Sequence, residues 1–130
     1  MISPLIESAT AVRERAYAPY SRFQVGAALL TTNGRVFRGC NVENISFGLT
    51  LCAERSALVS AIAEGEFSFR AVVIVADTDV PISPCGACRQ VLAEFAPDLV
   101  VVSATLKGLT ETFSLADLLP RSKTGILNSP

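Results

Sequence analysis

The chain contains no histidine and no tryptophan, and charged residues make up only 18% of its 130 residues. The lack of histidine removes the commonest metal ligand and the commonest general base at neutral pH, which leaves acid–base chemistry to Glu, Asp, Lys, Tyr or Cys. Lys and Arg number 11 against 12 Asp and Glu, and this net charge of −1 lacks the basic excess typical of nucleic-acid binding. The longest apolar run, residues 71–76, is far shorter than the roughly 20 residues that span a membrane.

Apolar residues are abundant instead, at 50% of the chain. A length of 130 residues predicts one domain over residues 1–130, with an irregular tail from about residue 121. The apolar excess predicts that part of the surface closes an oligomer. The N-terminus lacks a basic segment followed by an apolar stretch, so we expect a cytoplasmic protein. Four cysteines in such a chain favour metal binding or redox chemistry over a disulfide framework.

Apolar spacing and turn residues predict alternating helices and strands. Ser3 and Pro4 fit the N-cap and first position of a helix that runs to about Ala18, before Pro19. The other predicted elements are a hairpin with strands at 23–31 and 36–43 around Asn33-Gly34, a helix at 52–64 ahead of Gly65, a central strand at 71–76, a helix at 85–95, strands at 99–104 and 110–114, and a short helix after a capping box at Ser114 and Asp117. This order predicts the α/β fold class, as a three-layer α/β/α sandwich with a mixed five-stranded sheet.

The strongest chemical signal joins cysteines at the starts of two predicted helices. Cys85 and Cys88 share one helix face and can chelate one ion, and Cys52 supplies a third ligand from the other helix. Helix N-termini stabilise thiolates. Three protein ligands leave tetrahedral zinc with one open position, which is the arrangement of a catalytic site. A water molecule fills this position in such sites, and zinc lowers its pKa to about 7. We therefore expect one Zn²⁺ per chain.

Charged neighbours complete this predicted site. Glu54 lies in the first turn of the helix that Cys52 opens, where its carboxyl can take a proton from the water and deliver it to a substrate. Three thiolates over-neutralise Zn²⁺, and we expect Arg55, Arg89 or both to offset this charge by donating to the sulfurs.

Two other interpretations of the cysteines stay open at this point. A C-x-x-C motif alone also suits a structural zinc knuckle or a redox pair. A non-catalytic zinc module needs a fourth ligand, and Cys40 is the candidate. Strand alternation turns Cys40 away from Asn41 and Glu43 and favours a core position for it.

Four segments resemble the small, single-domain cytidine deaminases, in the order found in that family. They are AYAPYSRFQVGAA (16–28), GCNVEN (39–44), CAER (52–55) and SPCGACRQVL (83–92). The wider deaminase class holds zinc with three Cys, or with His and two Cys, and uses Glu as the proton carrier.

The resemblance implies zinc-dependent hydrolytic deamination of cytidine and deoxycytidine at C4 of the ring, giving uridine or deoxyuridine and ammonia in pyrimidine salvage. By this resemblance, zinc is held by Cys52, Cys85 and Cys88, and Glu54 shuttles protons. It also implies a homotetramer with shared active sites.

The resemblance further implies four substrate contacts. Asn41 and Glu43 match the pair that holds the ribose hydroxyls, Phe23 matches an aromatic that packs on the pyrimidine, and the backbone of Ala53 binds the ring carbonyl. Alternation along the strand independently places Asn41 and Glu43 on one sheet face. The alternatives are an Asx-type turn with a solvated Glu43, and a core position for Phe23.

One departure from the family concerns the C-terminal tail. The family usually has an aromatic after the position of Pro120, whereas no aromatic follows Phe113 in this chain. Either Ile126 or Leu127 supplies apolar cover, or the pocket is more open. An open pocket suits the alternative substrates, a modified cytosine nucleoside or a cytosine-nucleoside antibiotic.

Overall fold

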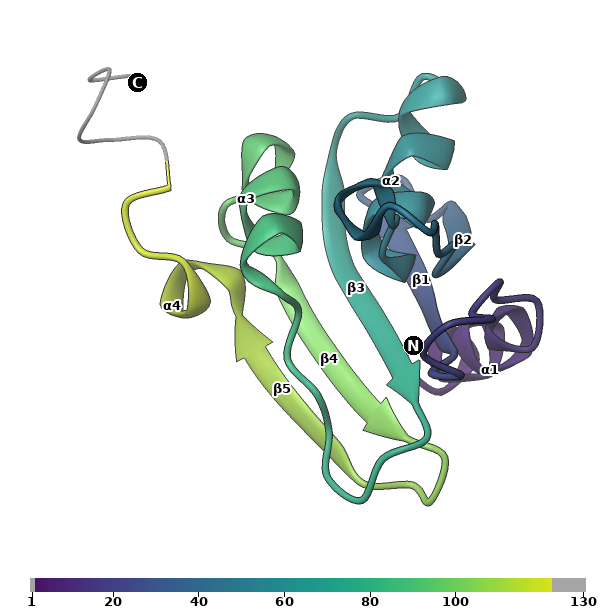
Figure 1. Ribbon diagram of the computed structural model, residues 1–130. Helices are drawn as coiled ribbons and strands as arrows, with labels where there is room; N and C mark the ends of the chain where they lie inside the picture. The colour runs from purple at the N-terminus through teal and green to yellow at the C-terminus, as the bar shows by residue number, and fades with distance from the viewer. Residues whose placement is uncertain (1, 123–130) are drawn as a thin grey trace.

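The computed structural model describes residues 2–122, which form a five-stranded sheet with helices on both faces (Figure 1). The strands are β1 (Val25–Thr31), β2 (Val36–Cys40), β3 (Phe69–Ala76), β4 (Val100–Thr105) and β5 (Thr110–Ser114). The helices are α1 (Ile2–Arg13), the 3₁₀ turn η1 (Phe47–Leu49), α2 (Ala53–Ala63), α3 (Gly86–Phe95) and α4 (Leu115–Leu118).

The sheet is mixed, as predicted, and its strand order is β2-β1-β3-β4-β5. β3 and β4 pair in parallel, and the other neighbours pair antiparallel. The apolar run 71–76 lies in the central strand β3 and is buried along its whole length, which explains why it does not alternate.

Two separate apolar clusters cover the two faces of the sheet. The larger one packs α2, α3 and Leu115 of α4 on one face, and the smaller one packs Leu5 and Ala9 of α1 on the other. Figure 1 shows α2 and α3 in front of the sheet and α1 behind it. The predicted three-layer α/β/α arrangement is confirmed.

One helix start and one helix cap differ from the prediction. α1 begins at Ile2, ahead of the predicted N-cap Ser3, so Pro4 lies inside the first turn. Proline is tolerated there because the first N–H groups of a helix have no intrahelical partner. Ser114 does precede α4, but its side chain makes no capping hydrogen bond, so the predicted capping box with Asp117 is wrong.

The end of α1 also differs, since the helix stops at Arg13 and not at about Ala18. The reason is a competing set of backbone hydrogen bonds. The N–H of Tyr17 donates to the carbonyl of Asn41 at 3.0 Å, and the carbonyl of Tyr17 accepts from the N–H of Glu43 at 2.8 Å. These bonds hold the chain extended beside the end of the β-hairpin.

The second hairpin strand is shorter than predicted for residues 36–43, because β2 ends at Cys40. Beyond it, Val42 forms isolated bridges with Tyr17 on one side and Leu51 on the other. The bridges keep the backbone extended without a continuous ladder. The η1 turn was not predicted, and the remaining elements agree with the prediction to within two residues at each end.

Two remaining predictions concern membrane-spanning segments and the residues after Pro120. Among the helices described between residues 2 and 122, none is long and apolar enough to cross a membrane. Ile126 and Leu127, the residues named as apolar cover, lie outside the described residues.

Two glycines let helices approach the sheet more closely than a side chain would allow. A Cβ atom at Gly26 would collide with the backbone of Ala9 in α1. A Cβ atom at Gly39 would lie 2.5 Å from the carbonyl oxygen of Ala53, and closer still to the N atom of Ala57. Both of these partners are backbone atoms of α2, so Gly39 sets the position of that helix.

We predict that Gly39→Ala pushes α2 away from β2 and destabilises the protein by about 1–3 kcal/mol, the usual cost of overpacking. The measurement is the free energy of unfolding from urea denaturation. Gly48→Ala is the matched control, because a Cβ atom there meets nothing within 4 Å. Equal stability of the two variants would contradict the proposed close approach.

Candidate functional site

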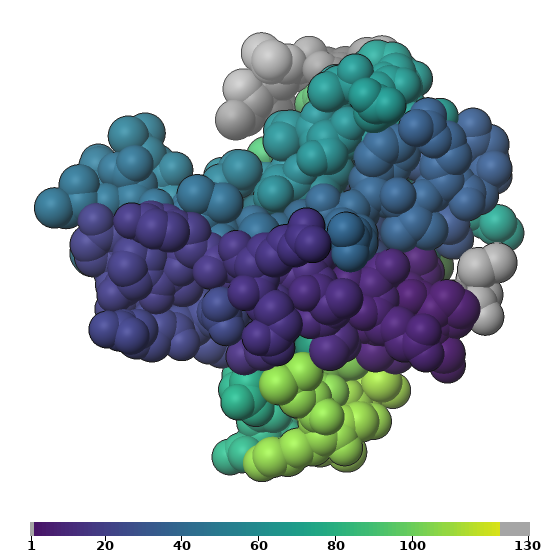
Figure 2. All heavy atoms as spheres, turned by 90° about the vertical axis from the view of Figure 1, so that its right-hand side faces the viewer, coloured from purple at the N-terminus to yellow at the C-terminus, as the bar shows by residue number. Residues whose placement is uncertain are grey.

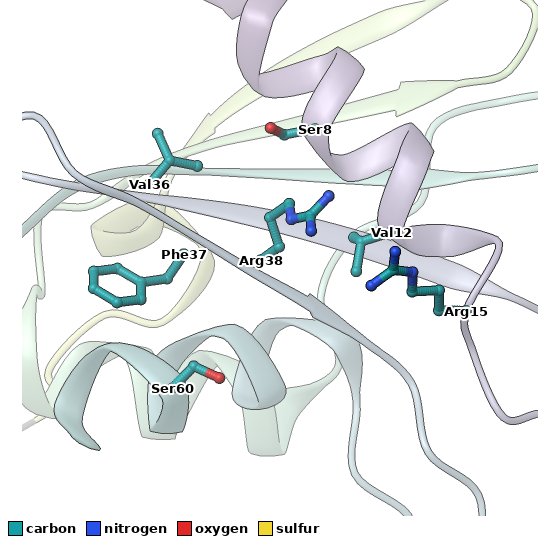
Figure 3. Close-up of a pocket in the computed structure, with 7 residues that line it drawn as sticks. All are labelled: Ser8, Val12, Arg15, Val36, Phe37, Arg38 and Ser60. Carbon is teal, nitrogen blue, oxygen red and sulfur yellow. The ribbon is translucent and has the colours of Figure 1, made fainter. Parts of the chain in front are cut away.

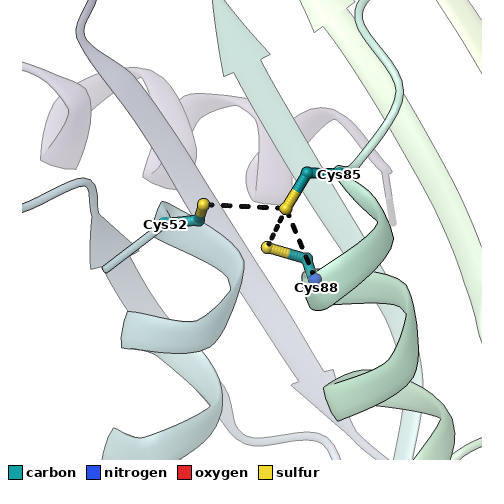
Figure 4. Close-up of side chains that lie close together, drawn as sticks. All are labelled: Cys52, Cys85 and Cys88. Atoms are coloured by element: carbon teal, nitrogen blue, oxygen red, sulfur yellow. Dashed lines mark hydrogen bonds between the residues drawn. The ribbon is translucent and has the colours of Figure 1, made fainter. Parts of the chain in front are cut away.

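Three cysteines from two helix starts lie together (Figure 4). Cys52 is the N-cap of α2, Cys85 is the N-cap of α3, and Cys88 lies in the first turn of α3. The Sγ atoms of Cys52 and Cys85 are 3.9 Å apart, and those of Cys85 and Cys88 are 3.3 Å apart. All three sulfurs lie within 4.8 Å of one another. Within residues 2–122, Cys40 does not join this cysteine cluster and is half-buried at the end of β2.

The strand directions explain why these helix starts meet. β2 and β3 both run antiparallel to β1, so they run in the same direction and their carboxyl ends lie at the same edge of the sheet. α2 follows β2 and α3 follows β3 in the chain, so both helices begin near that edge. Their N-terminal N–H groups and positive dipole ends therefore surround the cysteine cluster, where they stabilise negative charge. The N–H of Cys88 donates to the Sγ of Cys85 at 3.4 Å.

The thiols of the cluster differ in acidity. A hydrogen bond from the Cys88 thiol, together with the Arg55 guanidinium and Cys85, lowers the pKa of Cys52 to about 5 against the opposing effect of burial. The same hydrogen bond and burial raise the pKa of Cys88 well above its ordinary value. One thiolate thus forms readily even without a metal, and a cation is needed to stabilise all three.

The donor set fits zinc. A tetrahedral zinc site with zinc–sulfur distances of about 2.3 Å places its sulfurs about 3.8 Å apart, close to the separations observed here. Thiolate sulfur is also a ligand that zinc prefers. The three cysteines fill three of the four positions, which is the ligand count of a catalytic site.

The two arginines of the motifs behave differently. Arg55 donates from Nη2 to the Sγ of Cys52 at 3.4 Å and to the carbonyl of Thr50 at 3.4 Å. Its positive charge is therefore close enough to offset the thiolates. Arg89 instead donates away from the sulfurs, to the carbonyls of Pro84 at 2.8 Å and Leu118 at 3.1 Å and to the hydroxyl of Ser83 at 3.3 Å. It ties the start of α3 to α4.

Glu54 is a buried carboxyl in the first turn of α2, with only 5% of its surface exposed. Burial, helped by the charge of Cys52, raises the pKa of Glu54 to about 7. A carboxyl with this pKa both takes up and releases protons at neutral pH, as a general acid–base group must. Ala53 beside it is fully buried at the first position of the helix.

Asn41 directly follows β2, and Phe23 lies just ahead of β1. The side chain of Asn41 accepts from the N–H of Val25 at 2.8 Å and donates to the carbonyl of Phe23 at 2.7 Å. These bonds join the end of β2 to the start of β1, which differs from the Asx-type turn considered above. The Phe23 ring is 38% exposed and lies outside both core clusters, contrary to the core alternative.

Glu43 points at the loop before β1. Its carboxylate accepts from the N–H groups of Tyr20 at 2.9 Å and Ser21 at 3.1 Å, and also from the hydroxyl of Ser21. The Ser21 hydroxyl is the largest of the causes that lower the pKa of Glu43. Glu43 is thus an ionised acceptor held by the loop and not a freely solvated side chain.

One hollow lies in this region, and another is lined by different residues. The first, of about 350 Å³, is lined by Tyr20, Ser21, Glu43, Phe47 and Thr50. The second, of about 540 Å³, lies between α1 and β2, and its lining residues, which include Arg15, Arg38 and Ser60, contain none of the predicted site residues (Figure 3).

Sequence reasoning missed Ser21 and Thr50 as members of this region. Ser21 falls within one of the family segments, but a single serine in a loop has no spacing that indicates a role. Thr50 contributes its backbone carbonyl to Arg55, which no side-chain pattern reveals.

Comparison with known proteins agrees with this geometry. The family described as "Cytidine and deoxycytidylate deaminase zinc-binding region" matches residues 2–104. A cytidine deaminase of Sporosarcina psychrophila is 50% identical over 120 residues, which cover 92% of this chain and 88% of that protein. A blasticidin-S deaminase of Bacillus cereus is 31% identical over 108 residues, which cover 77% of this chain and 76% of that protein.

Among solved structures, a crystal structure of cytidine deaminase from Burkholderia pseudomallei superposes on this chain with a TM-score of 0.89. The two sequences are 54% identical, and the match covers 92% of this chain and 97% of that one. The mixed sheet with helices on both faces is therefore a fold shared with such enzymes.

We predict one zinc ion per chain in the purified protein, measured by inductively coupled plasma mass spectrometry. Cys52→Ser removes a ligand and should lower the zinc content about tenfold or more at equal free zinc. Cys40→Ser is the matched control and should keep its zinc. Loss of zinc from the Cys40 variant would indicate a four-cysteine site instead.

Proposed function

The chain belongs to the cytidine and deoxycytidylate deaminase family, and from this membership we propose that it converts cytidine and deoxycytidine to uridine and deoxyuridine with release of ammonia. The observation that carries the proposal is the three-cysteine cluster beside a buried carboxyl whose pKa lies near 7. Hydrolysis of an exocyclic amine needs an activated water and a group that moves protons, and this site has residues suited to both tasks.

Cys52, Cys85 and Cys88 would hold the zinc ion. Bound zinc acts as a Lewis acid that makes water acidic enough to be a nucleophile at neutral pH. Arg55 keeps the sulfur cluster from carrying excess negative charge, because its guanidinium donates directly to Cys52.

Glu54 carries the protons. Its carboxylate accepts the first proton of the attacking water and passes it to the ring nitrogen beside C4. It then accepts the second proton, from the hydroxyl group now on C4, and passes it to the amino group, which leaves as ammonia while the C4 carbonyl forms. Burial supports this role, since a pKa near 7 makes the two protonation states of Glu54 similar in free energy at neutral pH.

Four residues would position the nucleoside. Asn41 and Glu43 would hold the sugar hydroxyls, Phe23 would pack against the pyrimidine, and the backbone of Ala53 would bind the ring carbonyl. The exposed ring of Phe23 supports its role. The carboxamide of Asn41 uses one N–H and one lone pair in its bonds to the start of β1. One N–H and one lone pair remain, and both can bind a sugar hydroxyl.

Unmodified cytidine is favoured over the alternative substrates. The blasticidin-S deaminase at 31% identity is compatible with a modified cytosine nucleoside or an antibiotic as substrate. The cytidine deaminase at 50% identity over 92% of the chain supports cytidine itself.

We predict that the zinc-loaded protein converts cytidine to uridine, followed by the fall in absorbance of the cytosine ring. Glu54→Gln should reduce kcat by about 10²–10⁴-fold, the usual contribution of a general acid–base group, with unchanged zinc content. Glu7→Gln, an exposed carboxyl on α1, is the matched control. Negligible turnover of cytidine beside rapid turnover of C5- or N4-substituted analogues would favour the alternative substrates.

We also propose a homotetramer with shared active sites. The support is an apolar loop around η1, in which Ile45, Phe47 and Leu49 are 80%, 79% and 72% exposed. In Figure 2 this segment projects from the body of the molecule at the upper left. Phe47 also lines the hollow beside Glu43, so a neighbouring chain packed on this loop would cover the substrate side of the site.

We also propose that the protein acts in pyrimidine salvage in the cytoplasm, which suits the free cysteines of the cluster. Free thiols persist in reducing compartments, and all three cysteines of the cluster are free.

We predict that Ile45→Asp, which places a charge in this apolar loop, shifts the protein from a tetramer to smaller species in sedimentation-velocity analysis. Val80→Asp is the control, since Val80 is 68% exposed but lies in the loop between β3 and α3. A monomeric wild-type protein, or an unchanged assembly in the Ile45 variant, would contradict the proposal.

A further inference from the structure

We propose that Ser21 is a positioning residue for the sugar of the substrate, an inference that rests on the proposed cytidine deamination. Its hydroxyl fixes the Glu43 carboxylate and the Phe23 backbone in one hydrogen-bonded unit, so that the carboxylate is aimed at a sugar hydroxyl.

The two oxygens of Glu43 are used unequally. Oε1 accepts from two backbone N–H groups, those of Tyr20 and Ser21, which fill its two lone-pair directions. Oε2 accepts only from the Ser21 hydroxyl, among the contacts described for residues 2–122. One acceptor position therefore remains on Oε2, beside the Ser21 side chain. Because the carboxylate is ionised, this position accepts a hydrogen bond and a sugar hydroxyl must donate it.

The Ser21 hydroxyl also accepts a hydrogen bond, from the N–H of Phe23 at 3.0 Å. The chain of bonds runs from the Phe23 N–H to the Ser21 oxygen, and from the Ser21 O–H to Oε2 of Glu43. Bonds linked in this way strengthen one another. The residue proposed to pack on the base and the residue proposed to bind the sugar are thus joined by a single side chain.

Two further bonds hold this loop: the N–H of Arg22 donates to the carbonyl of Ala18 at 3.0 Å, and Asn41 donates to the carbonyl of Phe23. Tyr20, Ser21 and Phe23 are all exposed, and Arg22 between them has a positive φ of 61°, which is unfavourable for a residue with a side chain. Ser21 and Glu43 both line the hollow of about 350 Å³. Without the hydroxyl, Oε2 loses its partner, and only the two N–H bonds to Oε1 hold the carboxylate, so Oε2 is free to turn about that oxygen.

The test compares two substrates, cytidine and 2′,3′-dideoxycytidine, with the zinc-loaded full chain. For cytidine, Ser21→Ala should raise KM about tenfold, as expected for loss of a hydrogen bond to a charged group, with kcat within about twofold of wild type. For dideoxycytidine, which has no sugar hydroxyl at those positions, the KM of the variant should equal that of wild type. Ser21→Thr, which keeps the hydroxyl, should restore the KM for cytidine.

Ser60→Ala is the matched control, because Ser60 is an exposed serine on α2 that lines the other hollow (Figure 3). Zinc content and circular dichroism check that each variant is folded. An unchanged KM for cytidine in Ser21→Ala, or an equal rise in KM for both substrates, overturns the role of Ser21 while leaving the deaminase function intact. A folded, zinc-loaded wild type that turns over neither substrate overturns the proposed function and this inference with it.

Discussion

The convergence of two helix N-termini at one edge of the sheet is the constraint on which the site depends. β2 and β3 run in the same direction on either side of β1, so the helices that follow them start side by side. Each start carries a cysteine in the N-cap position, so the positive ends of both helix dipoles lie beside the sulfur cluster. Gly39 lets α2 pack closely against β2, and Cys52 at the start of α2 lies 3.9 Å from Cys85, measured between the sulfurs.

The same packing determines the acid–base chemistry. Because α2 lies close to the sheet, Glu54 in its first turn is removed from water, and its pKa rises to about 7. Burial of the Glu54 carboxyl lowers the stability of the fold, and it also gives the carboxyl a pKa suited to proton transfer at neutral pH. Arg55, the next residue, donates to the sulfur of Cys52 and places a positive charge beside the cysteine cluster. A single helical turn thus carries the proposed metal ligand Cys52, the proposed proton carrier Glu54 and the counter-charge of Arg55.

Much of this organisation could be predicted from residue patterns. The C-x-x-C motif, the Cys-Ala-Glu-Arg segment and the apolar run 71–76 led to the ligand set and to the layered fold, because each is a local pattern with a direct physical meaning. The end of α1 could not be predicted in this way, since Tyr17 leaves the helical pattern to pair with a strand that follows much later in the chain. Arg89 resembles Arg55 in its place after a metal motif, yet only the tertiary contact with Leu118 draws it away from the sulfurs. The bond between Ser21 and Glu43 likewise depends on two segments that meet only in the folded protein.

The separation of the three sulfurs along the chain has a consequence for biosynthesis. Cys52 leaves the ribosome before Cys85 and Cys88, because β3 lies between α2 and α3 in the chain. During that interval the Cys52 thiol lacks the hydrogen bond from Cys88, which is the largest of the causes that lower its pKa. The acidity of Cys52 is therefore complete only after Cys85 and Cys88 have been translated and the starts of α2 and α3 have met.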